Sequence, residues 1–166
     1  FCARHSLDPK RPIVALLAGS RKQEIRDNLP IMLATTKHFK EFQWVIAGAP
    51  GTDEQTYRQV LTQSTSSQRT SIVYGETYPL LTHSYGAMVT SGTATLETAL
   101  FRVPQVVCYY TMCGKIVNFL RRIILKVKHI SLVNLVADRS VVPELVADKM
   151  CEQELREALK QILTDE

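Results

Sequence analysis

The sequence predicts an α/β fold, a doubly wound Rossmann-like parallel sheet, and two observations support this prediction. Short apolar runs rich in β-branched residues alternate along the chain with longer segments of helical spacing. Several of these runs end on glycine, including those at 13–19, 42–48 and 70–75. Because the carboxyl ends of parallel strands meet at one edge of a sheet, these glycine junctions should lie where such folds bind ligands.

The first strand, residues 13–19, is followed by a helical pattern over about 22–40 that contains a proline. A proline inside a helix removes one backbone hydrogen bond, so we place Pro30 in a first turn, with Asn28 as a possible N-cap. This region is therefore interpreted as a loop followed by a helix.

The rest of the chain continues the alternation of strands and helices. Strands are expected at 42–48, 70–75, 86–92, 103–110 and 130–137, and helices after Thr52 or Asp53 and over 77–84, 93–101, 114–128 and 151–166. The last helix is amphipathic, with leucines at helical spacing. Residues 1–11 show neither a helical nor a strand period and are interpreted as a linker remnant of a longer protein, with 12–166 forming one domain.

Composition narrows the classes of function. A chain of 166 residues can bury one core, and its formal charge of +4 is too small to indicate a nucleic-acid partner. Its four cysteines form no CxxC pair and have no histidine at metal spacing, so we expect free thiols and no metal site. No apolar run is long enough to span a bilayer.

The first glycine junction carries residues suited to phosphate. Gly19 allows a close backbone approach, Ser20 offers a hydroxyl, and Arg21 offers a planar guanidinium. The alternative is a plain turn with a solvated arginine, which we favour on these three residues alone.

A second junction follows the strand at 86–92. Ser91, Gly92 and Thr93 stand at the start of a helix, whose outward N–H groups form an anion site. Glu97 lies about one turn further in and can accept both hydroxyls of a ribose. The alternative is a capped helix with a solvated Glu97. No GxGxxG or GxxxxGK[ST] pattern is present, which argues against an NAD site and a P-loop.

Two further segments allow more than one interpretation. In one interpretation, Asn134 hydrogen-bonds a sugar or a phosphate and Arg139 pairs with an anion. In the other, the loop caps itself, and Arg139 and Glu144 form a surface ion pair that contributes little to stability. The segment 114–128 interleaves basic and apolar residues. It suits either an anionic membrane surface and a lipid substrate, or a core helix with a hydrated basic face.

Four motifs together resemble one family. PIVALLAGSRKQEI, SGTATLE, VPQVVCYY and SLVNLVADR occur in the order and approximate spacing of the carboxyl-terminal half of lipid-A-disaccharide synthase. That enzyme is a glycosyltransferase of the two-domain B-type fold, and the resemblance runs from about Pro12 to the end. Ala18 and Val133 replace prolines that are frequent in the family, at positions that stiffen the backbone and carry no chemistry.

The resemblance implies a reaction and its partners. The full enzyme would transfer 2,3-diacylglucosamine from UDP to 2,3-diacylglucosamine 1-phosphate, forming the lipid A disaccharide precursor and releasing UDP. It would be a cytoplasmic enzyme of a Gram-negative bacterium, peripheral on the inner face of the inner membrane through 114–128, and the resemblance allows a homodimer of the full-length protein. Residues 12–166 would be its nucleotide-sugar-binding Rossmann-like domain, and 1–11 a linker remnant from a missing amino-terminal domain. No cofactor or metal is expected.

The resemblance also implies roles for particular residues. Arg21 and Asn134 would be catalytic, and the general base would lie in the amino-terminal half, so this chain alone should bind nucleotide without turnover. The implied binding residues are Gly19, Ser20 and Arg21 toward the diphosphate or the acceptor, Ser91, Gly92 and Thr93 around the diphosphate, Glu97 on the ribose, and Asn134 and Arg139 near the diphosphate.

Two alternatives stay open at this point. One is another UDP-sugar enzyme of the same architecture, such as a peptidoglycan glycosyltransferase or a UDP-sugar 2-epimerase. The other is a non-catalytic, membrane-docking module that binds nucleotide.

Overall fold

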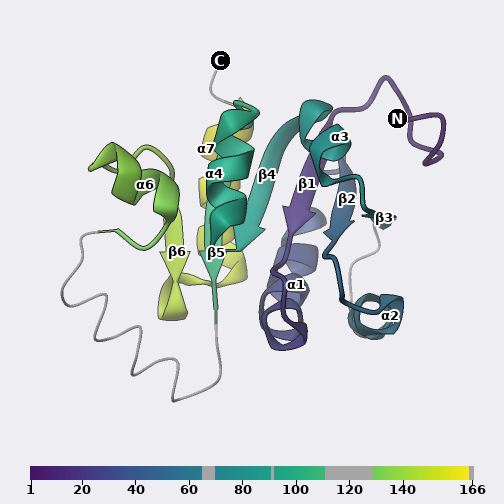
Figure 1. Cartoon of the computed structure of the whole chain (residues 1–166), viewed down its shortest axis with the longest axis horizontal. Coiled ribbons are helices and arrows are strands. Elements are labelled where there is room, and N and C mark those ends of the chain that lie inside the picture. The colour runs from purple at the N-terminus through teal and green to yellow at the C-terminus, as the bar shows by residue number, and fades with distance from the viewer. Residues whose placement is uncertain (65–69, 91, 111–128, 165–166) are drawn as a thin grey trace.

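A computed structural model describes residues 1–64, 70–90, 92–110 and 129–164 of the chain (Figure 1). These residues form one six-stranded sheet in the order β3-β2-β1-β4-β5-β6, and every strand pair is parallel. Helices pack on both faces of the sheet, so the predicted doubly wound α/β fold is confirmed. The expected helix at 114–128 lies outside the described residues.

The elements alternate as expected for this fold. The strands are β1 (Ile13–Leu17), β2 (Gln43–Gly48), β3 (Thr70–Tyr74), β4 (Ser84–Thr90), β5 (Gln105–Tyr109) and β6 (Glu144–Val146). The helices are α1 (Lys22–Thr36), α2 (Glu54–Gln63), α3 (Thr77–Thr82), α4 (Thr93–Leu100), α6 (Leu132–Ala137) and α7 (Glu152–Thr164), with a short 3₁₀ turn η1 at Ala147–Lys149.

The sheet is covered on both faces because its strands are apolar on both faces. All five residues of β1 are buried, with Val14 and Leu16 directed to one face and Ala15 and Leu17 to the other. A strand between two helical layers needs such a continuous apolar run, whereas a half-exposed strand would alternate.

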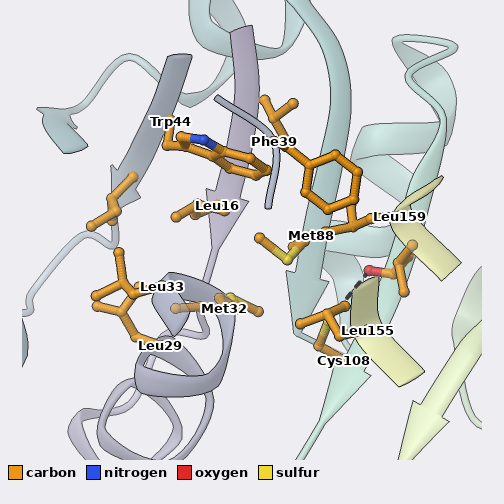
Figure 2. Packing of buried hydrophobic residues seen from close by; sticks show 14 of the residues in the cluster. Leu16, Leu29, Met32, Leu33, Phe39, Trp44, Met88, Cys108, Leu155 and Leu159 are labelled. Carbon is orange, nitrogen blue, oxygen red and sulfur yellow. Dashed lines mark hydrogen bonds between the residues drawn. The ribbon is translucent and has the colours of Figure 1, made fainter. Parts of the chain in front are cut away.

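The larger core lies between the sheet and helices α1, α2 and α7. Figure 2 shows its centre, where side chains of α1 and α7 meet the sheet around Leu16 and Met88. Trp44 of β2 is almost fully buried there and its ring packs edge-on against Phe39, with centroids 6.3 Å apart. This layer fixes α1, and therefore the loop that precedes it.

Helices α3 and α4 cover the opposite face. Leu80 and Leu81 of α3 are buried against that face, and they hold the short helix over the middle of the sheet. Residues 1–11 form turns without helix or strand and pack here as well. Arg4 and His5 both contact the carboxylate of Glu76, at 2.9 and 3.1 Å.

The expectation for Pro30 is wrong, because α1 runs unbroken from Lys22 to Thr36 with Pro30 inside it. Pro30 and Arg26, the residue four positions earlier, are both exposed. The Arg26 carbonyl that loses its helical donor thus faces solvent, which makes the proline tolerable. Asn28 is not a cap. It is fully buried, and its side chain binds the backbone of Tyr110 just after β5.

The expected strand at 130–137 is also wrong. Ser131 caps a short helix, α6, by accepting a hydrogen bond from the backbone N–H of Asn134 at 3.3 Å. The strand at this end of the sheet is β6, only three residues long, in a segment that we had interpreted as loop. β6 pairs with β5 and completes the sheet.

The free thiols expected from composition are confirmed for Cys2, Cys108 and Cys151, while Cys113 lies outside the described residues. Burial raises the pKa of the Cys108 thiol and keeps it protonated. Within the described part of the chain, no helix is long and apolar enough to cross a membrane.

The Asn28 amide joins α1 to the carboxyl end of β5, and its loss should destabilise the fold. Its Oδ1 accepts from the Tyr110 N–H at 2.8 Å and its Nδ2 donates to the Glu24 carbonyl at 2.9 Å. Asn28→Ala removes both bonds and leaves the half-buried Tyr110 N–H without its partner, so we expect a loss of about 1–3 kcal/mol in the free energy of unfolding, measured in urea. Arg26→Ala, exposed on the same helix, is the control and should change it by less than about 0.5 kcal/mol.

Candidate functional site

The two phosphate-like junctions meet where the order of strands reverses. The chain leaves β1 toward β2 and β3, then returns to place β4 on the other side of β1. A cleft of about 780 Å³ opens at the carboxyl ends of these strands. Its lining includes Gly19, Ser20, Arg21, Gly92, Thr93 and Glu97, so the structure brings together six of the residues that the sequence predicted. Ser91 lies outside the described residues.

Gly19 is required at the first junction by both its backbone and its neighbours. Its φ of +111° lies in a region that residues with a side chain rarely adopt, and a Cβ here would stand 2.6 Å from the Cβ of Glu24. The Glu24 carboxylate accepts hydrogen bonds from the backbone N–H groups of Ser20 and Arg21, at 3.0 and 3.3 Å. Sequence reasoning missed Glu24, although Arg21 and Glu24 have the spacing of a helix N-cap and the N3 carboxylate that completes it.

Arg21 remains available to a ligand. Its side chain is 81% exposed, and its guanidinium lies 3.5 Å from the Glu24 carboxylate, a distance typical of a weak surface ion pair. Because Glu24 already accepts from the N–H groups at this turn, the guanidinium is the group of this junction best suited to an anion.

The second junction presents a helix start without a side-chain cap. Gly92 has a φ of +143° and is the N-cap of α4, and no described side chain accepts a hydrogen bond from the first N–H groups of the helix. The carbonyl of Gly92 accepts from the hydroxyl of Thr95 at 2.8 Å, which fixes the first turn. The amide groups at Gly92, Thr93 and Ala94 thus stand at the positive end of α4, on the wall of the cleft.

Glu97 extends this wall one turn along α4. It lines the cleft and is half-buried, and within the described part of the chain its carboxylate has no hydrogen-bond or ion-pair partner. A partly buried carboxylate without a cation can accept hydrogen bonds from a ligand's hydroxyl groups.

Three further lining residues were missed by sequence reasoning. Thr90 is 2% exposed, and its hydroxyl has no hydrogen-bond partner among the described residues. Burial and the nearby Glu24 carboxylate raise the pKa of the Tyr109 phenol, which keeps it neutral. Tyr78, three residues after Gly75 at the end of β3, is an exposed aromatic residue of the cleft. For Tyr78 a signal was available, because it lies within a few residues of a strand-ending glycine.

The structure does not bring the Asn134 side chain to this cleft. The residue is 1% exposed, and its amide makes four hydrogen bonds within the loop between α6 and β6. Its Oδ1 accepts from the N–H groups of Val141 and Val142, at 2.8 and 3.0 Å. Its Nδ2 donates to the Val142 carbonyl at 2.9 Å and to the Glu144 carboxylate at 2.7 Å. The amide therefore fixes the loop that follows α6.

Glu144 is the centre of the same network. Its carboxylate accepts from the N–H groups of Ile130 and Ser131, both at 3.0 Å, and from the Ser131 hydroxyl at 2.5 Å. Burial raises the pKa of Glu144, but these hydrogen bonds outweigh burial and lower it below its ordinary value. The surface pair of Arg139 and Glu144 is not found among the described contacts. Arg139 is exposed and lies outside the lining of the cleft.

Comparison with known proteins identifies the family. The sequence profile of lipid-A-disaccharide synthetase matches residues 1–166. The chain belongs to this family. It is 38% identical over 160 residues to the lipid-A-disaccharide synthase of Acidobacterium capsulatum, covering 89% of this chain and 40% of that relative. It is 35% identical over 167 residues to that of Myxococcus xanthus, covering 98% and 42%. This family member thus spans about two fifths of the length of these curated relatives.

Solved structures resemble this synthetase-family chain in fold. One is Staphylococcus aureus MnaA in a structure with UDP, with a TM-score of 0.62 at 12% identity over 99% of this chain and 40% of that chain. Another is Escherichia coli ADP-heptose heptosyltransferase II, with a TM-score of 0.61 at 15% identity over 98% and 49%. The match to less than half of each neighbour agrees with the predicted half of a two-domain B-type glycosyltransferase fold.

The Gly19 turn yields a prediction with a built-in control. Gly51 also has a positive φ, +79°, but no atom lies within 4 Å of a Cβ placed there. We expect Gly51→Ala to cost about 1–2 kcal/mol of unfolding free energy for backbone strain alone. Gly19→Ala should cost more, because the Glu24 side chain must also move. Equal losses in urea unfolding would contradict the assigned contact between Gly19 and Glu24.

The Glu144 network should make stability fall in acid. Because the pKa of Glu144 is lower in the folded than in the unfolded chain, its ionised form stabilises the fold above the ordinary value of 4.5. This stabilisation is lost as the pH falls from there through the folded-state pKa. We expect Glu144→Gln to have a lower melting temperature than the unsubstituted chain near neutral pH, and the difference to narrow in acid. A difference independent of pH would show that ionisation of Glu144 contributes nothing.

Proposed function

We propose that this chain is the UDP-sugar-binding part of a lipid-A-disaccharide synthase. The complete enzyme would transfer 2,3-diacylglucosamine from UDP to 2,3-diacylglucosamine 1-phosphate and release UDP. The observation that carries the proposal is the convergence of three features in one cleft of a synthetase-family chain. The start of α4 and the Glu97 carboxylate, which has no partner among the described residues, lie on one wall, and the guanidinium of Arg21 lies on the side of β1.

The diphosphate is proposed to bind at the start of α4. Amide groups at Gly92 and Thr93 meet its oxygens, supported by the positive end of the helix. Arg21 provides the charge on the opposite side. As the bond between the sugar and the diphosphate breaks, negative charge grows on the leaving UDP, and these fixed donors stabilise it most in that state.

We propose that the reaction proceeds without a metal ion at this site. Among the residues that the structure describes, no three His, Cys, Asp or Glu side chains gather as a metal site. We propose that the helix terminus and Arg21 together do what a divalent cation does in metal-dependent transferases.

Glu97 is proposed to hold the ribose. It lies four residues after Thr93, a rise of about 6 Å along α4, so a ribose attached to a diphosphate at the helix start reaches its carboxylate. Both ribose hydroxyls can donate to one carboxylate, which selects a nucleotide over a simple diphosphate.

Asn134 is proposed to act by positioning and not by touching the donor. Its amide is fully used in the loop that leads from α6 to β6, and α6 packs beside α4. Asn134 and Glu144 would thus support the wall that carries Glu97. Arg139, exposed on the same loop, is proposed to meet an anionic group of a substrate that extends beyond the lining of the cleft.

The remaining parts of the reaction are proposals about the complete protein. The general base that deprotonates the acceptor hydroxyl would come from the part of the relatives that this chain does not match. The basic and apolar segment 114–128 would contact the inner face of the inner membrane, where acylated substrates reside. A homodimer of the complete protein is a further proposal.

Glu97 provides the sharpest test of nucleotide binding. We expect UDP to bind the chain. Glu97→Ala should lower the affinity for UDP by roughly ten- to a hundredfold, measured by calorimetry, because the charged hydrogen bonds to the ribose are lost. Pyrophosphate should bind both forms equally, because it lacks a ribose. Glu157→Ala removes an exposed carboxylate on α7, outside the cleft, and should leave UDP affinity unchanged.

The same titration distinguishes the diphosphate contacts. Arg21→Ala should lower the affinity for UDP and for pyrophosphate alike, because the guanidinium is proposed to contact the diphosphate group that both ligands carry. If a folded sample bound neither ligand, the phosphate site at α4 would be wrong for this chain. If the folded chain bound anionic vesicles but not UDP, it would be better described as a membrane-docking module that does not bind nucleotide.

A further inference from the structure

Tyr78 is an exposed aromatic residue that the assignments above leave without a role. Its side chain belongs to the first turn of α3, lines the cleft, and is 55% exposed. An aromatic ring of this kind would normally be buried or hydrogen-bonded, and its exposure inside a concave site indicates a ligand surface.

The ring is held in place by its neighbour. Its centroid lies 5.3 Å from that of Phe101, the residue that ends α4, with the two planes inclined by 36°. Phe101 itself packs against the buried face formed with Leu80 and Val103. Tyr78 therefore lines the cleft while its ring contacts Phe101, which is itself packed against the core.

The position along α4 indicates which part of a ligand meets this ring. Thr93 begins the helix, Glu97 lies a rise of about 6 Å further on, and Phe101 lies about 12 Å from the start. The cleft thus presents an anion site, a carboxylate and an aromatic surface in that order. A nucleoside diphosphate presents phosphates, ribose and base in the same order.

We propose that Tyr78 is the stacking platform for the nucleobase of the donor. This inference rests on the proposed function, because it extends the same ligand beyond Glu97. Stacking on an aromatic ring contributes to binding of any base, since every base has a π-face, so Tyr78 supplies affinity and not discrimination among bases. The phenol hydroxyl is not needed for this role.

The test compares two exposed tyrosines in the 166-residue chain. Tyr85 is 47% exposed and also packs on a phenylalanine ring, Phe42 at 5.8 Å, but it does not line the cleft. We expect Tyr78→Ala to lower the affinity for UDP by roughly ten- to a hundredfold, the effect typical of removing an aromatic residue that stacks on a base. The affinity for pyrophosphate should not change. Tyr78→Phe should keep the affinity for UDP, and Tyr85→Ala should resemble the unsubstituted chain.

Each other outcome overturns the stacking role for a different reason. If the chain binds UDP and Tyr78→Ala binds it equally well, the base lies elsewhere while the proposed function stands. If Tyr78→Ala loses pyrophosphate and UDP together, the residue shapes the cleft instead of stacking. If Tyr78→Phe loses UDP as strongly as Tyr78→Ala, the hydroxyl makes the contact. If the unsubstituted chain binds neither ligand, the proposed function itself fails and this inference fails with it.

Discussion

The parallel pairing of β1 with β4 is the interaction on which the site depends. Leu17 at the end of β1 pairs with Val89 near the end of β4. This register places Gly19 and Gly92 just beyond the same line, on neighbouring strands whose following segments turn to opposite faces of the sheet. The helices diverge there, α1 to one face and α4 to the other, and the gap between their starts becomes the cleft.

The two buried layers hold this register from both sides. A slip of one residue between β1 and β4 would exchange their two sets of side chains, moving Leu16 and Met88 out of the layer with α1 and α7. Both layers are close-packed, so side chains moved into the other layer would fit there only with steric strain. The position of the site is thus a consequence of packing, although the residues that form it lie in loops and at a helix start.

Much of the fold could be predicted from the sequence because its signals were strong and local. The central strands are short β-branched runs that end on glycine, and their order along the chain alternates with helical segments. The errors arose where local signals compete. ISLVNLVA has strand-forming residues, but Ser131 caps a helix and Asn134 bonds to the following loop, so tertiary contacts decide the outcome. Pro30 is tolerated within α1 because the carbonyl that it leaves unpaired faces solvent, which no local pattern reveals.

Residues that line the cleft could be predicted where the residue type alone indicates a chemical role. They were missed where that role depends on distances in the folded chain. Glycines at strand ends, Arg21 and Glu97 could be recognised from sequence. Asn134 could not be assigned, because an amide in a loop suits a ligand and a structural role equally well until its four partners are known. Tyr78 reaches the cleft only because α3 crosses over the sheet at this point. Its ring contacts Phe101, which lies more than twenty residues later in the chain, so the contact cannot be inferred from the local sequence.

Glu24 distinguishes the start of α1 from the start of α4, where we propose that the diphosphate binds. In many doubly wound folds a phosphate binds at the start of the helix after the first strand. Here the Glu24 carboxylate accepts the Ser20 and Arg21 N–H groups, so this turn already carries a negative charge and these two donors are occupied. A diphosphate would be repelled from it. The start of α4 has no such carboxylate among the described residues, and its first amides remain open. The first junction still offers the exposed guanidinium of Arg21, which lines the cleft. The carboxylate of Glu24 in the first turn of α1 thus distinguishes the two junctions: the first presents a guanidinium to the cleft, and the second presents the N–H groups at the start of α4.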